Sequence, residues 1–433
     1  MLRSLVVCLL LSLAIAFEGN YKILRLIPAN DNQYKTLLDE YYKANSDIQF
    51  LDNPLNETNV DVKVVERADA DFEGFLSYKK IDYAQIYPND GIKVPANYSI
   101  PDDCRMFQLG KYCEYDSMVK YMQHLSSLRP HIAETQVLGY THHDRPIVGM
   151  KIGAKNWNPH KRTVVIDAGI HAREWQSSHT AMFYIAELVE KYGFDEQITD
   201  LLDNLDIFII PELNPDGYEY GRSSDFFEIR MWRANRGPRK MINGSDCSGT
   251  DLNRNFDLHW DGKGSSNDPC SIMYQGKASF SEPESRAIRN LLLNKNIKEN
   301  ITAYISLHAF SKFIILPYSY ENGTYPDDID DVRKVAEEAA DAMLPLNKER
   351  FRVGTSPELL DYFMPGSSVD WAKAVAKVKY TYCIELPPRP RDEDSFTIKY
   401  GYFQPPKHQL MPIALESWKG IKVILEAAMN LKI

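Results

Sequence analysis

Four continuous apolar runs constrain the fold of this chain more than any other feature of its sequence. They are RTVVIDAG at 162–169, LDIFIIPELN at 205–214, NITAYISLHAF at 300–310 and KYTYCIEL at 379–386. Because apolar and polar residues do not alternate in them, these runs are typical of central strands covered on both faces. Amphipathic helical patterns occur at 177–193, 283–295 and 416–430. The sequence therefore predicts an α/β fold with a mixed, mostly parallel sheet and helices on both faces.

The N-terminal part of the chain has a different pattern. Residues 17 to about 100 alternate short strand-like and helix-like segments and end in the turn-rich stretch IYPNDGIKVPANYSIPDD. We interpret this part as a small α/β unit followed by a linker. Lys93 and Arg105 are candidate cleavage sites for a trypsin-type protease in this region.

The first sixteen residues, MLRSLVVCLLLSLAIA, predict a secretory signal peptide. One arginine precedes an apolar run that ends in the small-x-small sequence Ala14-Ile15-Ala16. A membrane anchor needs about 18–20 apolar residues, and neither this run nor any later stretch is long enough. We therefore expect a secreted chain that begins near Phe17 and has no membrane partner. Asn-x-Ser/Thr sequons agree with secretion and occur at Asn56, Asn97, Asn243, Asn300 and Asn322.

The cysteine count fits an oxidising compartment. Loss of Cys8 with the signal peptide leaves five cysteines, which predicts disulfide pairs and one leftover thiol. Cys383 lies in an apolar run and is expected to be the buried, unpaired thiol. The pairs close enough in sequence to bridge a surface loop are Cys104 with Cys113 and Cys247 with Cys270.

Charge excludes one class of partner. The net charge is −10, and the sequence has no basic tract long enough to follow a phosphate backbone. Nucleic acid is therefore not an expected partner. With 433 residues, the chain is also long enough for more than one folding unit.

Two His-x-x-Glu motifs differ in their position along the chain. His171 and Glu174 follow a predicted buried strand and precede a helix, which is where α/β sheets place their sites. His131 and Glu134 lie in the polar segment PHIAET, so we interpret His131 as a surface or helix-end residue. His308 also ends a predicted buried strand. Two strand-end histidines with Glu174 make up the His2Glu set of a catalytic zinc site.

Six motifs in a fixed order carry a resemblance to a known family. They are HAREW, RMWRANR, DLNRNFD, ISLHAF, GSSVDW and IEL. The series resembles the metallocarboxypeptidases of the pancreatic carboxypeptidase A/B type over nearly the whole chain. The resemblance implies a secreted zinc exopeptidase, made as a zymogen, that removes the last residue of peptides and proteins with a free C-terminus. It implies a signal peptide at 1–16, an activation propeptide and linker at 17–104, and a catalytic domain at 105–433.

The resemblance also implies roles around the metal. His171, Glu174 and His308 match the ligands of one Zn2+ per chain, and Asp251 matches an aspartate that hydrogen-bonds a ligand histidine. Glu385 matches the general base. This role suits a carboxylate beside a zinc-bound water, because the metal lowers the pKa of that water toward 7. An unpaired glutamate in so apolar a run would otherwise be costly.

Further matches concern the substrate. Asn253 and Arg254 match the clamp for the terminal carboxylate, which a planar guanidinium can bind through both oxygens. Tyr362 matches a mobile tyrosine that closes over the substrate. Arg233 matches the arginine that stabilises the oxyanion, and Arg173 matches a residue of an upstream subsite.

The pocket for the C-terminal side chain is predicted to be apolar. In the family, the residue before the Asp-Trp pair of GSSVDW lies in this pocket, and an aspartate there selects lysine or arginine. Here the residue is Val369, and the nearby Ile315, Met364 and Cys383 carry no charge either. Because an apolar pocket cannot compensate a buried ammonium, we expect a preference for aliphatic or aromatic C-terminal residues.

Two departures from the family pattern concern the rim of the site. Phe310 stands where many members have tyrosine, and after Leu386 the chain continues PPRPRDEDSF where relatives usually have an arginine and an acidic residue. Phe310 lacks the hydroxyl that would give one hydrogen bond to the peptide, and the loop after Leu386 borders the site and bears on substrate range and inhibitor response. The alternatives are a carboxypeptidase of basic or broad specificity and a catalytically silent secreted binding protein. We further expect a monomer that a trypsin-like protease activates.

Overall fold

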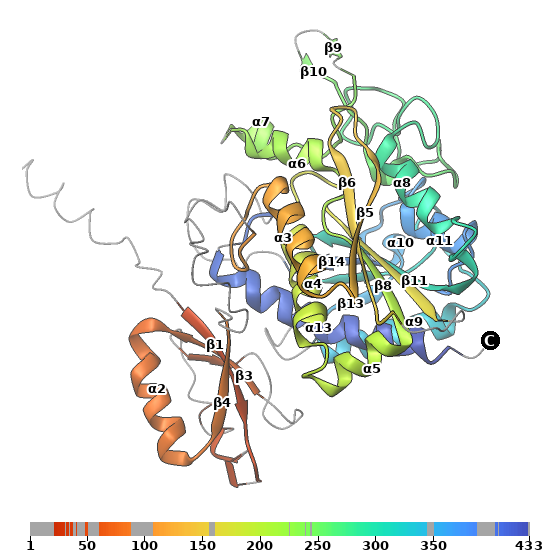
Figure 1. Ribbon diagram of the computed structural model, residues 1–433. Helices are drawn as coiled ribbons and strands as arrows, with labels where there is room; N and C mark the ends of the chain where they lie inside the picture. Colours follow the sequence, from red (N-terminus) through yellow and green to blue (C-terminus); the bar gives the residue numbers. More distant parts are fainter. Residues whose placement is uncertain are drawn as a thin grey trace, which may run out of the picture. The chain divides into compact units, whose positions relative to one another are not determined.

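The computed structural model contains two compact units, 1–96 and 97–433 (Figure 1). The expected cleavage sites Lys93 and Arg105, and the loop after Pro387, lie outside the described residues. The described residues are 21–30, 32–33, 35–37, 40, 48–50, 60–87, 107–155, 161–224, 226–238, 240–242, 245–343, 350–387, 403–405 and 407–431.

The first unit is a small antiparallel sheet with one helix. The strand order is β2-β3-β1-β4. Val60, Val62 and Val64 alternate along β3 and pack against Phe72 and Leu76 of α2, so one face of the sheet is buried under the helix. This is the small α/β unit that the sequence predicts. The elements are β1 (Tyr21–Ile27), β2 (Ile48–Phe50), β3 (Val60–Val65), α2 (Glu66–Lys79) and β4 (Asp82–Tyr87).

The second unit is built on an eight-stranded mixed sheet with the order β13-β12-β14-β11-β7-β8-β6-β5. The four apolar runs form its four central strands, which pair in parallel with one another. All nine residues of β11 are buried, as expected of a strand covered on both faces. The predicted fold class is thus confirmed. The strands are β5 (Ala133–Tyr140), β6 (Pro146–Ile152), β7 (Arg162–Ala168), β8 (Leu205–Ile210), β11 (Ile301–Ala309), β12 (Phe313–Ile315), β13 (Arg352–Gly354) and β14 (Tyr380–Leu386).

The outer strands do not follow from the apolar pattern. β5 and β6 form an antiparallel hairpin at one edge of the sheet, where β5 is half exposed. At the other side, β12 and β13 have three residues each, too few for a recognisable pattern. Antiparallel pairing of β6 with β8 and of β12 with β14 makes the sheet mixed.

Helices cover both faces of the sheet. α4 and α13 contact each other and the central strands from one side, whereas α8 and α11 pack on the side that Val165 and Tyr304 face. The helices are α3 (Tyr115–Leu128), α4 (Trp175–Lys191), α5 (Glu196–Asn204), α6 (Pro215–Arg222), α7 (Phe227–Arg230), α8 (Pro283–Leu292), α9 (Ile329–Ala342), α10 (Ser356–Leu360), α11 (Ser368–Ala374) and α13 (Lys407–Met429). None of those in the described ranges combines the length and apolar character that a membrane crossing requires.

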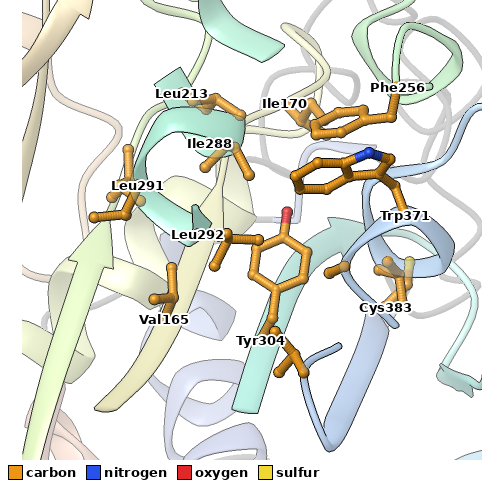
Figure 2. Packing of buried hydrophobic residues seen from close by; sticks show 14 of the residues in the cluster. Val165, Ile170, Leu213, Phe256, Ile288, Leu291, Leu292, Tyr304, Trp371 and Cys383 are labelled. Atoms are coloured by element: carbon orange, nitrogen blue, oxygen red, sulfur yellow. The ribbon is translucent and has the colours of Figure 1, made fainter. Parts of the chain in front are cut away.

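An aromatic cluster fixes α11 on the sheet. Figure 2 shows Trp371 of α11 above Tyr304 of β11, with Phe256 beside it. The Trp371 ring meets Phe280 edge-on at a centroid distance of 5.3 Å. Since Val369 lies on the same short helix, this packing also determines where Val369 lies.

The pairing of the central strands brings the candidate site residues to one edge of the sheet. His308 is directly opposite Glu385 in the parallel pair β11–β14. His171 follows the end of β7, which pairs with β11 on its other side. The carboxyl ends of parallel strands meet at the same edge, which is where open α/β sheets bind ligands.

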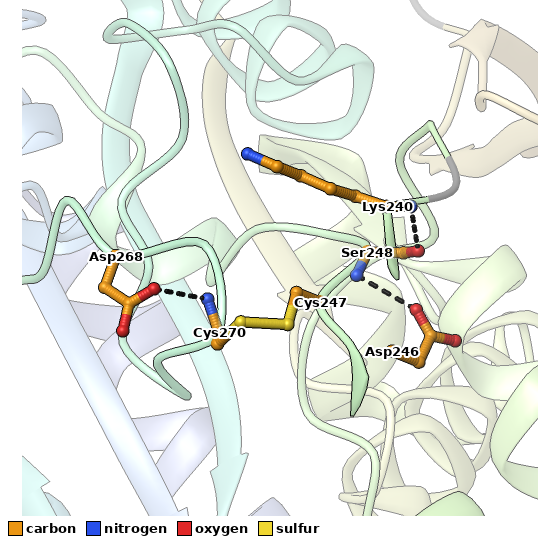
Figure 3. Close-up of a disulfide and its surroundings, with 6 residues drawn as sticks. All are labelled: Lys240, Asp246, Cys247, Ser248, Asp268 and Cys270. Carbon is orange, nitrogen blue, oxygen red and sulfur yellow. Dashed lines mark hydrogen bonds between the residues drawn. A yellow bond between two sulfur atoms is a disulfide. The ribbon is translucent and has the colours of Figure 1, made fainter. Parts of the chain in front are cut away.

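One disulfide closes the loop that carries the DLNRN segment. Cys247 and Cys270 are bonded, as expected (Figure 3). Asp268 accepts a hydrogen bond from the Cys270 backbone N–H at 2.9 Å. Cys383 is free and buried, also as expected. Cys113 is disulfide-bonded, and its expected partner Cys104 lies outside the described residues.

Shortening a side chain should lower the free energy of unfolding far more in a central strand than in the edge hairpin. Ile207 in β8 is fully buried, so Ile207→Ala should lower the free energy of unfolding by about 2–5 kcal/mol through lost burial and a cavity. Val137 in β5 is 54% exposed, and Val137→Ala should change it by less than about 0.5 kcal/mol. Urea unfolding followed by tryptophan fluorescence measures both. Equal losses would contradict the assignment of β8 to the centre of the sheet.

Candidate metal centre

Three buried side chains converge at the carboxyl ends of β7 and β11. The Nδ1 atoms of His171 and His308 lie 3.2 Å apart. The two carboxylate oxygens of Glu174 lie 2.7 Å from Nδ1 of His171 and 3.1 Å from Nδ1 of His308. All three residues are at most 3% exposed. The structure thus brings together the three predicted zinc ligands.

The donor set fits zinc. Two imidazole nitrogens that face each other beside a carboxylate suit a bound cation, and zinc takes two histidines and a glutamate in catalytic sites. A second convergent group, His308 with Cys383 and Glu385, shares His308 with the first. Burial raises the pKa of the Cys383 thiol, whereas a metal ligand must be a thiolate. The group of His171, Glu174 and His308 is therefore the better site.

Charges around Glu174 and His171 favour metal binding. Burial opposes ionisation of Glu174, but the two histidines outweigh it and hold the pKa of Glu174 below its ordinary value. Burial lowers the pKa of His171, and the positive charge of Arg233 lowers it further. A neutral imidazole and an ionised carboxylate are the forms that bind a metal.

Asp251 links the metal centre to Arg233. Its Oδ1 is 3.2 Å from Nε2 of His171, the ring nitrogen that faces away from the other donors. Its Oδ2 accepts a hydrogen bond from Nε of Arg233 at 3.0 Å and forms an ion pair with Nη2 of the same guanidinium at 2.9 Å. Although Asp251 is buried, Arg233 and Arg254 hold its pKa well below the ordinary value. A carboxylate in this place fixes the ring and tautomer of His171.

Glu385 lies beside the metal centre at the end of β14. Burial raises its pKa to about 7, and the charge of Glu174 acts in the same direction. A carboxylate with a pKa near neutrality can both take up and release a proton. The placement agrees with the role expected of Glu385.

Arg254 and Asn253 lie on the short helix η1 (Leu252–Arg254), directly after Asp251. Arg254 is fully buried and donates to the backbone oxygens of Gly264 and Asn253, at 3.0 and 2.7 Å. Its Nη2 donates to the hydroxyl of Tyr362 at 2.6 Å. The Asn253 side chain accepts from the backbone N–H of Ser368 at 3.0 Å. The predicted clamp residues and the predicted mobile tyrosine are thus adjacent.

Arg173 lies between the metal centre and the segment 403–405. Its Cζ is 4.3 Å from the Phe403 ring centroid, and Phe403 meets Phe310 edge-on at 4.8 Å. Burial lowers the pKa of Arg173 to about 10, so it remains a cation at neutral pH. Phe310, the departure from the family pattern, therefore packs in the aromatic contact beside Arg173.

A family model described as zinc carboxypeptidase matches residues 118–420. The chain belongs to the zinc carboxypeptidase family. Carboxypeptidase A2 of Rattus norvegicus is 32% identical over 417 residues, 95% of this chain and 94% of the relative. Carboxypeptidase B of Astacus astacus is 34% identical over 313 residues, 72% of this chain and 95% of the relative. This chain is therefore a metallocarboxypeptidase, a hydrolase.

A solved structure matches both the fold and most of the chain. The crystal structure of thrombin activatable fibrinolysis inhibitor has a TM-score of 0.67 and is 28% identical, and the match covers 95% of this chain and 99% of that chain. The family is a zinc family, and the convergent donors of this carboxypeptidase fit that metal.

Two asparagines that the sequence analysis did not single out tie the site segments together. Asn214 donates to the backbone oxygens of Ile170 and Ala234, which precede His171 and follow Arg233. Asn235 exchanges two hydrogen bonds with Thr250, the residue before Asp251. Their neighbours in LNPDG and RANRG give turn signals, but nothing in the sequence states which backbone each amide reaches.

The predicted pocket residues of the carboxypeptidase gather in one apolar cluster. Val369, Ile315 and Cys383 are 4%, 2% and 3% exposed and belong to the core beneath α11, and Met364 packs against it. They come from a helix, two strands and a loop, so only the fold brings them together. None of these four side chains is ionised at neutral pH, because burial keeps the Cys383 thiol protonated.

The second His-x-x-Glu motif is a surface feature. His131 and Glu134 are exposed; the His131 ring lies beside Tyr192 at 6.1 Å, and Glu134 is 4.0 Å from the amine of Lys155. The prediction that His131 is a surface residue is confirmed.

The zinc content of single-residue variants should distinguish the two His-x-x-Glu motifs. His171→Ala and His308→Ala each remove one of three protein donors, so the purified variants should hold less than a tenth of the zinc of the wild type. His131→Ala should keep the wild-type content. Elemental analysis after dialysis against a metal-free buffer measures this. Wild-type zinc in His308→Ala would rule out the proposed ligand set.

Proposed function

We propose that this chain is a secreted, zinc-dependent exopeptidase that hydrolyses the C-terminal peptide bond of peptides and proteins and prefers apolar or aromatic C-terminal residues. The observation that carries the proposal is the meeting of three groups at one sheet edge. These are the zinc donors, a carboxylate with a raised pKa, and a buried arginine suited to a free carboxylate. One zinc per chain is proposed, since the second convergent group shares His308 with the first.

His171, Glu174 and His308 would hold the zinc. The metal, when bound, supplies Lewis-acid chemistry and makes water more acidic. Glu385 takes the proton from the attacking water at its carboxylate and later gives it to the leaving amine, a cycle that suits its pKa of about 7. Asp251 keeps His171 oriented through the 3.2 Å contact with its Nε2.

Two arginines stabilise the negative charges of the reaction, which are the oxyanion and the C-terminal carboxylate of the substrate. Arg233 is held by Asp251 and lies 4.0 Å from the Glu174 carboxylate, which places its charge beside the zinc donors. There it stabilises the oxyanion that develops as the carbonyl becomes tetrahedral. Arg254, with Asn253, binds the C-terminal carboxylate of the substrate, and Tyr362 closes over it. Arg173 contacts the peptide upstream of the scissile bond.

The pocket residues support the proposed specificity, whereas the overall similarity to relatives does not. The similar proteins include carboxypeptidases named A and B at comparable identity, so overall similarity favours neither. Val369 and its neighbours Ile315, Met364 and Cys383 offer no counter-charge for lysine or arginine. Basic or broad specificity is the alternative. A silent binding protein is disfavoured because the three donors, Asp251 and Glu385 are all present in this chain.

We also propose that the chain is a secreted zymogen and a monomer, with a signal peptide at 1–16, a propeptide and linker at 17–104 and a catalytic domain at 105–433. The signal-like N-terminus, the disulfides and the separate small unit support this organisation. A trypsin-like protease would cleave in the linker.

The activity is tested with two peptides that differ only in a final Phe or Lys. The trypsin-treated protein should release Phe far faster than Lys, and 1,10-phenanthroline should abolish release because it removes the metal. Glu385→Gln should lower kcat by roughly 10²–10⁴-fold while zinc content stays unchanged, since a positioned base contributes that much. Faster release of Lys would overturn the specificity, and no release from the zinc-loaded, processed protein would favour a binding protein.

Activation is tested by gel electrophoresis after trypsin treatment. If Cys104 pairs with Cys113, a cut only at Arg105 leaves the N-terminal segment attached until reductant is added. A cut at Lys93 frees that segment without reductant. Lys93→Gln should therefore leave a fragment that separates only on the reducing gel. Release without reductant in this variant, with cleavage at Arg105 verified, would refute the Cys104–Cys113 bond.

A further inference from the structure

The turn that carries two of the three zinc donors, residues 171–174, lies between a strand and a helix and belongs to neither. Glu174 is the N-cap residue of α4, with φ −91° and ψ 54°, and its side chain makes no capping hydrogen bond. Its carboxylate instead faces the ring nitrogens of His171 and His308. Because no strand or helix ladder fixes this turn, contacts from other segments have to hold the donors in place.

Arg230, the last residue of α7, contacts the chain on both sides of Glu174. Its Nη1 donates to the backbone oxygen of Arg173 at 3.1 Å. Its Cζ lies 3.4 Å from the centroid of the Trp175 ring, so the guanidinium lies over the indole. Arg230 is 2% exposed and Trp175 is 8% exposed. Since water is largely excluded from both groups, this cation–π contact is of the stronger, desolvated kind.

Two further hydrogen bonds support this arrangement. The backbone oxygen of Arg233 accepts from the N–H of Ala172 at 3.0 Å. Arg230 is also fixed from another segment, because its Nε donates to the side-chain oxygen of Gln404 at 3.0 Å. The segment 230–233 thus contacts the metal-binding turn and the residue after it at three positions that flank the glutamate donor.

We propose that Arg230 is a positioning residue of the metal centre, which holds the Glu174 carboxylate in place by fixing the residue before it and the residue after it. The proposal rests on the proposed function, in which Glu174 is a zinc donor. Arginine suits this task because its planar guanidinium donates hydrogen bonds from its edge while its face lies on an aromatic ring. A lysine, which is a flexible point charge, cannot do both.

Arg230→Lys tests the proposal because it keeps the positive charge and removes the planar fork. The zinc Kd, measured by adding Zn2+ to the metal-free protein in competition with a chromogenic chelator, should rise roughly 10- to 100-fold, as is usual when a residue that orients a metal ligand is lost. A wild-type zinc Kd in Arg230→Lys would overturn the proposal.

Arg222→Lys is the matched control. Arg222 lies near the same indole, with its Cζ 5.5 Å from the Trp175 ring centroid, but its Nη1 donates to the backbone oxygen of Tyr112, outside the metal-binding turn. Its replacement should leave the zinc Kd unchanged. An equal rise of the zinc Kd in both variants would mean that the positive charge near Trp175, and not the hold on the turn, sets the affinity, which would also refute the proposal.

Thermal unfolding with and without zinc distinguishes positioning from a general effect on stability. A bound ligand raises Tm in proportion to the logarithm of its affinity, so the zinc-induced rise in Tm should be smaller in Arg230→Lys than in the wild type. If Arg230 served packing alone, the metal-free and the zinc-bound protein would lose the same Tm. A zinc-induced rise equal to that of the wild type would therefore contradict a positioning role.

Trp175→Phe keeps the proposal testable if Arg230→Lys does not fold. Phenylalanine leaves a smaller ring beneath the guanidinium and a weaker cation–π contact, so the zinc Kd should rise severalfold. If both variants fold, the double variant should raise the zinc Kd by less than the product of the two single factors, because both substitutions remove the same contact. An unchanged zinc Kd in Trp175→Phe would count against the proposal.

The wild-type titration separates this proposal from the proposed function. If the wild type binds zinc and Arg230→Lys binds it equally well, the positioning role fails and the proposed function stands. If the wild type binds no zinc, the proposed function itself fails.

Discussion

The parallel pairing of β7, β11 and β14 is the constraint on which the rest of the site depends. It places His308 opposite Glu385 and brings the end of β7, from which His171 and Glu174 follow, to the neighbouring position. A shift of this pairing by one residue would turn His308 toward the opposite face of the sheet. The long buried strands that dominate the sequence therefore do more than form the core. Their register determines whether the three donors meet at all.

Asp251 links the metal donors to Arg233 and to the turn that carries Arg254. One of its oxygens faces His171 and the other holds Arg233, while the turn that begins at Asp251 carries Asn253 and Arg254. The buried carboxylate stays ionised because two arginines surround it. Removal of either partner would leave a buried charge without compensation. The metal donors and the residues proposed to stabilise the oxyanion and to bind the terminal carboxylate are thus connected through one side chain.

The sequence predicts the parts that depend on local pattern. The central strands are continuous apolar runs, and His171, Glu174 and His308 stand at strand ends where a site is expected, so both follow from the chain itself. The edge strands β12 and β13 are too short to produce a pattern. Asn214 and Asn235 act across loops, and no spacing rule states which backbone oxygen an amide reaches. Long-range side-chain contacts of this kind require the folded structure.

The disulfide constrains one segment of the site and leaves the metal donors outside that segment. The Cys247–Cys270 bond encloses Asp251, Asn253 and Arg254 but none of the three metal donors, with a sequence separation of 23 residues. Closing a ring of this size removes chain entropy from the unfolded state worth roughly 3 kcal/mol. A reducing milieu would therefore loosen the segment that carries Asp251, Asn253 and Arg254, whereas a chelator would act on the three metal donors that lie outside it. This segment and the three metal donors thus respond to different chemical conditions.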